Sequence, residues 1–195
     1  MPHTVRHLLL HPSRLWSRHE VLQRPSPVPQ EPGVYGWYFR DIPDGVPTDG
    51  CHRHAGMTLL YVGISPRRPP VNGAPPSRQQ LRKRIRYHFR GNAEGSTLRL
   101  TLGCLLSTRL GIELRRVGGG TRHTFASGEA LLSDWMQDNA FVCWAPHPDP
   151  RTCEEELIRQ LVLPLNLEGN SHAFRPKLSA LRSAARGRAG QLPIA

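Results

Sequence analysis

One carboxylate in this chain stands where it could bind a metal ion. Glu154 shares a helical phase with Leu157, Ile158 and Leu161, which follow at positions i+3, i+4 and i+7, so it should face the same buried side as they do. An inward carboxylate is costly unless it is paired or bound to a cation. The spacing therefore predicts Glu154 as the ligand of a divalent cation, Mg²⁺ or Mn²⁺.

The carboxylates that follow Glu154 have ordinary helical roles. In a helix over 153–163, Thr152 is expected to be the N-cap, and Glu155 completes a capping box three residues later. Glu156 should turn toward solvent. The alternative for Glu154 itself is structural, because an anion at a helix start interacts favourably with the helix dipole.

Two basic side chains are placed to bind an anion. Ser77 and Gln80 form a capping-box pattern that predicts a helix running to about residue 89. The buried stripe of this helix is expected to be Leu81, Ile85 and Phe89. Arg84 and His88 flank the stripe and can lean toward the core, which suits a phosphate clamp. The alternative is a solvated basic face, which fits the other cations of this helix.

Two short apolar segments must form the sheet on which these groups converge. Residues 33–39 (GVYGWYF) and 59–64 (LLYVGI) are aromatic, apolar and bounded by proline or glycine, so they are predicted to be paired strands. Alternation puts Tyr35 and Tyr38 on opposite faces, and a facing register would bring Tyr35 and Tyr61 together. Gly36-Trp37-Tyr38 offers a rival reading in which Tyr38 is the functional phenol.

The remaining patterns predict an α+β fold. A third strand is expected at 141–144, giving a small three-stranded, mainly antiparallel sheet flanked by helices. Helical spacing predicts inserted helices at 96–110 and 129–137, and alternation around a triple glycine predicts a hairpin within 112–125. A last, basic helix is expected after Phe174.

The order of these residues resembles the GIY-YIG nuclease superfamily. Gly33-Val34-Tyr35 followed by Tyr61-Val62-Gly63 is similar to the paired signature of that family, with valine for isoleucine in both triplets. The resemblance implies four further functional positions, which are Arg84, His88, Glu154 and Asn166. They correspond to the catalytic arginine, a histidine or tyrosine, the metal-binding glutamate, and the asparagine that ends the motif.

Such a set of residues suits the hydrolysis of a phosphodiester bond. Negative charge builds up around the phosphorus, a water must lose a proton, and a leaving oxygen must be stabilised. Arg84 and His88 would hold phosphate oxygens, and the metal ion on Glu154 would ease departure of the leaving group. Tyr35 is the candidate base, and Tyr61 would position the water or the phosphate.

The expected function is that of a metal-dependent endonuclease acting on double-stranded DNA. Repair-type members tend to carry tyrosine where this chain has His88, which favours the restriction-like branch. One alternative is a nucleic-acid-binding module that has the nuclease fold but is catalytically silent. Another is a repair or recombination nuclease that reads the structure of DNA and not its sequence.

The charge balance also indicates a polyanionic partner. Lys and Arg total 26 against 15 Asp and Glu, a formal charge of +11, and only Lys83 and Lys177 are lysines. Arginine binds phosphate oxygens in a bidentate manner; the alternative is an arginine bias of genome composition. The candidate DNA contacts on the basic helices and the hairpin are Arg82, Arg86, Arg115, Arg116, Arg122, Arg175, Lys177 and Arg182.

Length and composition favour one soluble domain. The expected organisation is an extension with a proline-rich linker (1–31), a nuclease domain (32–174) and a basic tail (175–195), with insertion 91–139 dividing the domain core into 32–90 and 140–168. Segment 40–58 is expected to be a long loop, either a substrate-contacting arm, which its histidines and Arg53 favour, or a tolerated surface insertion, and segment 66–76 is expected to be irregular. Four dispersed cysteines and the lack of a long apolar run predict a cytoplasmic protein without membrane contact. No pattern indicates an oligomeric state.

Overall fold

The computed structural model describes residues 2–67 and 79–195. The strands are β1 (Gly33–Phe39), β2 (Arg53–His54), β3 (Met57–Ser65), β4 (Arg115–Val117), β5 (Arg122–Thr124) and β6 (Ala140–Pro146). The helices are α1 (Pro2–Leu10), α2 (Arg18–Leu22), α3 (Leu81–Arg90), α4 (Thr97–Leu105), α5 (Ser107–Leu110), α6 (Gly128–Asn139), α7 (Pro150–Gln160) and α8 (Arg175–Gln191). Within the described residues, no helix is long and apolar enough to cross a membrane.

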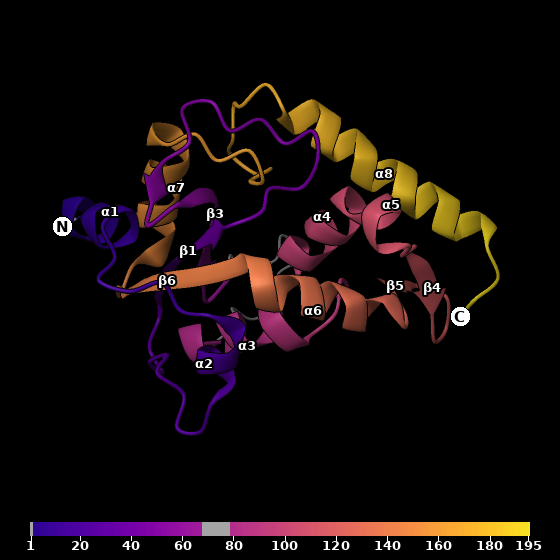
Figure 1. Ribbon diagram of the computed structural model, residues 1–195, viewed down its shortest axis with the longest axis horizontal. Coiled ribbons are helices and arrows are strands. Elements are labelled where there is room, and N and C mark those ends of the chain that lie inside the picture. The colour runs from indigo at the N-terminus through magenta and orange to yellow at the C-terminus, as the bar shows by residue number, and fades with distance from the viewer. Residues whose placement is uncertain (1, 68–78) are drawn as a thin grey trace.

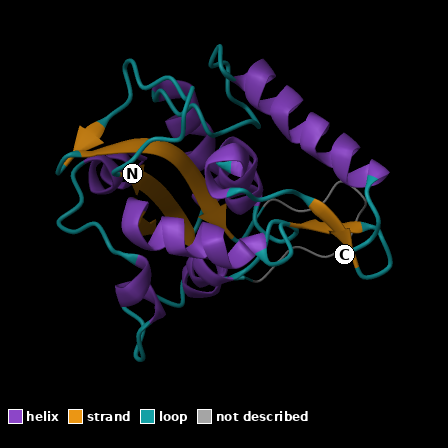
Figure 2. Ribbon diagram, turned by 45° about the vertical axis from the view of Figure 1, so that its right-hand side comes forward, coloured by secondary structure: helices purple, strands orange, loops and turns teal. Residues whose placement is uncertain are grey.

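The main sheet has four strands, not the three predicted. It is antiparallel with the order β2-β3-β1-β6, and Figure 2 shows it curled, with the β4–β5 hairpin set apart. The extra strand β2 forms because Ala55 and Gly56 take positive φ values of 50° and 74°, which suit a two-residue hairpin turn. The end of the 40–58 loop therefore folds back on the first two residues of β3.

The register explains one glycine of the second triplet. Tyr35 pairs with Gly63, and Tyr61 pairs with Trp37, so the expected facing pair of tyrosines is wrong. The two phenols share a face as diagonal neighbours. A Cβ atom on Gly63 would lie 2.7 Å from the Tyr35 hydroxyl oxygen. Glycine is therefore required at 63 because the ring of Tyr35 lies over it.

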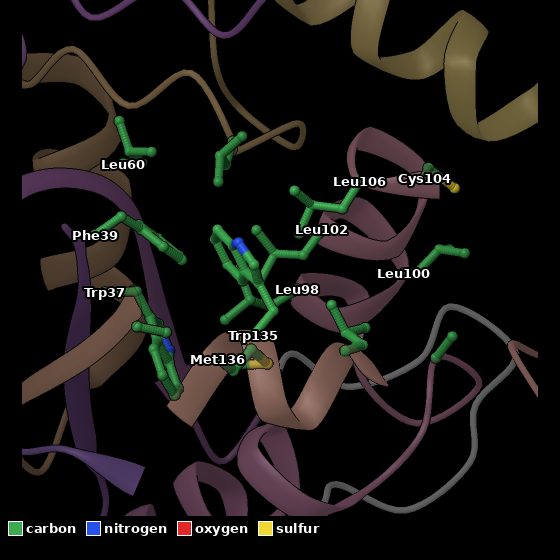
Figure 3. Close-up of a cluster of buried hydrophobic side chains, with 14 of the residues drawn as sticks. Trp37, Phe39, Leu60, Leu98, Leu100, Leu102, Cys104, Leu106, Trp135 and Met136 are labelled. Carbon is green, nitrogen blue, oxygen red and sulfur yellow. The ribbon is translucent and has the colours of Figure 1, made fainter. Parts of the chain in front are cut away.

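Helices cover both faces of the sheet. On one face, Trp37, Phe39 and Leu60 pack against Leu98, Leu102 and Trp135 of α4 and α6 (Figure 3). The opposite face packs against α1 and α7 (Figure 1). Tyr38 points to this second side, where its hydroxyl donates to the carbonyl of Leu9. Tyr38 and Tyr35 therefore lie on opposite sides of the sheet, as alternation predicts.

The start of α3 is capped by backbone instead of by a side chain. The helix begins at Leu81, after Gln80, which makes no side-chain cap; the predicted N-cap Ser77 and most of the 66–76 insertion lie outside the described residues. The amides of Leu81 and Arg82 donate to the carbonyls of Glu31 and Pro29. The proline-rich linker thus satisfies the helix start, and no capping box involving Gln80 is needed.

Helix α7 starts three residues earlier than predicted. Asp149 is the N-cap and accepts a hydrogen bond from the Thr152 amide, while Pro150 occupies the first turn. The predicted capping box of Thr152 and Glu155 is therefore wrong, and Glu155 is exposed. The prediction started the helix at Cys153 and did not use Asp149-Pro150, an N-cap residue followed by a proline that suits the first helical turn.

A buried arginine joins the inserted helices to α3. Arg99 is fully buried on α4 and forms an ion pair of 2.7 Å with Glu129 of α6. Its Nη1 also donates to the carbonyls of His88 and Phe89. Glu129 in turn accepts hydrogen bonds from backbone amides of two loops. This ion pair therefore connects the insertion to the helix that carries Arg84.

We expect Glu129→Gln to lower the free energy of unfolding by about 3 kcal/mol, because it removes the carboxylate that compensates a buried guanidinium. Urea denaturation followed by circular dichroism measures the change. The matched control is Asp134→Asn on the exposed side of α6, which should cost less than about 0.5 kcal/mol. Equal stability of the two variants would show that the Arg99–Glu129 pair does not support the fold.

Candidate functional site

Four of the predicted site residues meet at one pocket. A cavity of about 270 Å³ is lined by Tyr35, Tyr61, Arg84 and Glu154, which come from β1, β3, α3 and α7. Tyr35 is a core side chain whose polar end reaches the cavity wall. Strand pairing and the packing of two helices thus bring together groups from distant parts of the chain.

Arg84 is held in place by two acceptors. Its Nε lies 3.4 Å from the Tyr35 hydroxyl oxygen, and its Nη1 donates to the Gly95 carbonyl at 2.8 Å. Arg84 is only partly buried and lines the pocket. This arrangement presents a fixed cationic fork to an anion.

His88 lies behind Tyr35 and does not reach the pocket surface. The ring is fully buried, with Nε2 at 2.9 Å from the Tyr35 hydroxyl and Nδ1 at 2.7 Å from the Ser96 hydroxyl. The expected contact of His88 with phosphate is therefore wrong in this geometry. Burial, followed by the charges of Arg84 and Arg99, holds the pKa of His88 well below its usual value. The neutral ring supports Tyr35 instead.

Hydrogen-bond satisfaction selects one tautomer of His88. Ser96 Oγ accepts from the Arg99 amide, and its own hydrogen has no acceptor among the described residues other than His88 Nδ1. A buried hydroxyl without an acceptor costs about 1–3 kcal/mol. His88 should therefore carry its proton on Nε2 and donate it to the Tyr35 oxygen.

We expect the Nε2–H tautomer of His88 to exceed the other by about tenfold or more. Nitrogen chemical shifts of the histidine ring, recorded by long-range ¹H–¹⁵N correlation, measure the ratio. Ser96→Ala removes the donor to Nδ1 and should shift the population toward Nδ1–H. A wild-type protein with mainly Nδ1–H would contradict this assignment.

Burial opposes ionisation of the pocket phenols. It raises the pKa of Tyr35, while the adjacent Arg84 cation acts in the opposite direction. Burial also raises the pKa of Tyr61, against a hydrogen bond with Thr97. Tyr35 receives N–H donors from Arg84 and, in the selected tautomer, from His88, and such donors favour a phenolate.

Glu154 reaches the pocket around an open sheet edge. The neighbours of Glu154 on α7, Cys153, Leu157 and Ile158, pack on the face opposite Tyr35. Because β2 pairs only with the start of β3, the later part of β3 has no neighbouring strand on that side among the described residues. Glu154 itself lines the pocket together with Tyr35 and Tyr61.

The acidic lining fits a hard divalent cation. Glu154 and the exposed Glu168 both line the pocket. Among the described residues, no cluster of three or more His, Cys, Asp or Glu side chains could hold a metal by itself. Mg²⁺ commonly takes one or two carboxylates and completes its shell with water and substrate phosphate. Glu154, with Glu168 nearby, meets that requirement.

Asn166 covers the open edge of β3. Its side-chain amide donates to the Val62 carbonyl and accepts from the Val62 amide, both at 2.9 Å. The Leu165 amide donates to the carbonyl of Leu60. The side chain thus replaces a strand neighbour, and it holds the segment that leads to Glu168. In this structure Asn166 positions the site, because both ends of its amide are bonded to β3.

Most of the predicted DNA contacts bind the protein's own backbone. Five of the eight donate to main-chain carbonyls: Arg82 to Val28, Arg86 to Val21 and Gln23, Arg115 to Pro193, Arg116 to Ala189 and Leu192, and Arg175 to Leu167. Arg122 and Lys177 are exposed, and Arg182 is half-buried. The hairpin arginines thus hold the end of α8, which was not expected from their charge.

A basic groove adjoins the pocket. The groove has a volume of about 820 Å³ and is lined by cations of α3, including exposed Lys83 and Arg90. Arg67, Arg84 and Gly95 line both the groove and the pocket. The positively charged face of α3 thus leads directly to Arg84.

Sequence comparison identifies the family of this chain. A family model described as the GIY-YIG catalytic domain matches residues 33–184, which include both tyrosine triplets, α3 and α7. The chain therefore belongs to the GIY-YIG family, whose domains are nucleases and generally require a divalent metal. Searches of curated proteins and of solved structures returned no match.

Sequence reasoning gave Ser96 and Glu168 no role in the site, and it named Arg182 only as a candidate DNA contact. Arg182 was placed on an outer helix face, although it follows Leu178 by four residues and precedes Ala185 by three, both of which are buried. This helical spacing can be seen in the sequence, and it predicts that Arg182 faces inward.

Proposed function

We propose that this protein is a metal-dependent endonuclease that hydrolyses phosphodiester bonds of double-stranded DNA. The observation that carries the proposal is the convergence of Arg84, Glu154 and two tyrosines on one pocket at the end of a basic groove. The groove supplies sequence-independent attraction to a phosphate backbone. The pocket supplies the groups that act on a single phosphate.

The chain's own side chains account for the main demands of the reaction. Arg84 binds the scissile phosphate and stabilises charge as the oxygen of water bonds to phosphorus. Tyr35 takes the proton from that water, and Tyr61 orients the water or a phosphate oxygen. The bond from phosphorus to the leaving oxygen then breaks, and that oxygen gains a proton from solvent. A divalent cation at Glu154 would neutralise phosphate charge and stabilise the leaving oxygen.

The role of Tyr35 as base predicts a rate that rises with pH. Because burial raises the pKa of Tyr35, the active phenolate becomes more populated throughout the range from neutral to alkaline pH. The single-turnover rate at saturating metal should therefore increase about tenfold per pH unit there. Tyr35→Phe should lose this component, whereas Tyr38→Phe, on the other face of the sheet, should keep it. Identical pH profiles for wild type and Tyr35→Phe would exclude Tyr35 as the base.

A substrate panel tests the proposed function. Labelled duplex DNA, single-stranded DNA and duplex RNA are each incubated with the protein in Mg²⁺ or in excess EDTA. We expect cleavage of duplex DNA in Mg²⁺ only. Binding of the duplex without cleavage, both in Mg²⁺ and in EDTA, would favour the silent binding module. Discrete fragments from a long duplex would support the restriction-like branch, and cutting only at junctions or flaps would support a repair nuclease.

A further inference from the structure

Helix α8 turns one cation inward. Four basic residues of this helix are exposed to solvent, namely Arg175, Lys177, Arg186 and Arg188. Arg182 instead shares the buried face with Leu178 and Ala185. Figure 1 shows α8 lying along α4 and α5, and α8 packs against α4. An arginine therefore points from α8 toward the body of the domain.

The side chain of Arg182 lines a second cavity beside the first. This cavity has a volume of about 330 Å³, and its polar lining includes Thr97, Thr101 and Asn166 as well as Arg182. Both cavities are bordered by Tyr61, Thr97, Glu154 and Glu168. The two spaces are therefore adjacent, with Arg84 lining one, Arg182 lining the other, and Glu154 between them.

The guanidinium of Arg182 lacks a compensating partner within the described part of the chain. Its Nε is buried and has no hydrogen-bond acceptor there, and none of the ion pairs found includes it. Burial, followed by the like charge of Arg186, lowers the pKa of Arg182. A half-buried cation in this state is costly, so the site favours an anionic ligand.

We propose that Arg182 binds a second phosphate of the substrate strand, next to the phosphate held by Arg84. This inference rests on the proposed function, because it takes the anion to be a neighbouring phosphate of the same nucleic acid. The hydroxyls of Thr97 and Thr101 supply further donors in the cavity. The exposed Glu168 lines both cavities. A divalent cation shared by Glu154 and Glu168 would offset the negative charge of Glu168 toward the phosphate.

The test compares Arg182→Met with Arg186→Met, an equal loss of charge one turn later on the exposed face. Fluorescence anisotropy with a labelled DNA oligonucleotide in EDTA measures binding without cleavage. We expect Arg182→Met to weaken binding about tenfold and Arg186→Met to weaken it less than about twofold. Equal effects would overturn the proposal, because they would reduce Arg182 to general surface charge.

Stability and substrate size separate this role from a structural one. The melting temperature of Arg182→Met should equal or exceed that of wild type, because an uncompensated cation is removed; a clear decrease would indicate a structural arginine. Oligonucleotide cleavage should fall about tenfold more in Arg182→Met than cleavage of thymidine 5′-p-nitrophenyl phosphate, which has a single phosphodiester and no second phosphate to bind. Equal losses on both substrates would overturn the proposal. If wild type cleaved neither substrate, the proposed function would be wrong. The anisotropy comparison of Arg182→Met with Arg186→Met would still test whether Arg182 binds DNA.

Discussion

Replacing Glu154 by Gln should reduce the cleavage rate by about 10³-fold or more. Gln has the same size but lacks the charge that would hold a divalent cation in the pocket. Glu154 lines the pocket and is not part of the buried core. DNA affinity and the unfolding midpoint should therefore remain near those of wild type. Single-turnover cleavage, anisotropy and denaturation measure these three quantities.

The matched control for this variant is Glu155→Gln. Glu155 is exposed on the next position of α7 and does not cap the helix, because Asp149 does. Its replacement should leave cleavage and stability almost unchanged. Full metal-dependent activity of Glu154→Gln would place the active site elsewhere.

Replacing Arg84 by Gln should reduce cleavage by about 10²–10³-fold with little loss of DNA affinity. The guanidinium is fixed by Tyr35 and Gly95 and faces the pocket, so its contribution is greatest when charge develops on the phosphate. Single-turnover rates measured over a range of protein concentrations separate the loss of rate from a loss of binding.

Lys83→Gln provides the comparison for Arg84→Gln. Lys83 is an exposed cation in the basic groove, so its loss should lower affinity and reduce the salt slope of binding by about 1, with the bound rate unchanged. Arg86 is unsuitable because it holds the carbonyls of Val21 and Gln23. Equal, modest effects of both changes would mean that α3 is only a solvated basic face.

The parts of this fold that follow local rules were predictable from the sequence. Alternation placed Tyr35 and Tyr38 on opposite faces, and helical phase placed Leu81, Ile85 and Phe89 in the core. The register was not predictable in this way, because alternation fixes the face of Tyr35 but not its partner Gly63. Strand β2 was missed because a two-residue strand has no periodic pattern of its own.

Long-range contacts explain the other differences. His88 was expected beside the buried stripe of its helix. Ser96 from the insertion instead forms a hydrogen bond with its Nδ1, and the ring is fully buried. Charge could not distinguish an arginine that binds phosphate from one that binds a carbonyl. Arg116 shows the difference, since both of its acceptors come from the end of α8. Such contacts depend on chain crossings that local patterns do not encode.

The most direct test of the account is the conversion of supercoiled plasmid by wild-type protein and by Glu154→Gln, prepared in the same way. Each is incubated in Mg²⁺ and in Mg²⁺ with excess EDTA, and the nicked and linear forms are quantified over time. We predict that only wild type in free Mg²⁺ converts the plasmid. Equal conversion in EDTA, or equal conversion by Glu154→Gln, would contradict a metal-dependent active site at this pocket.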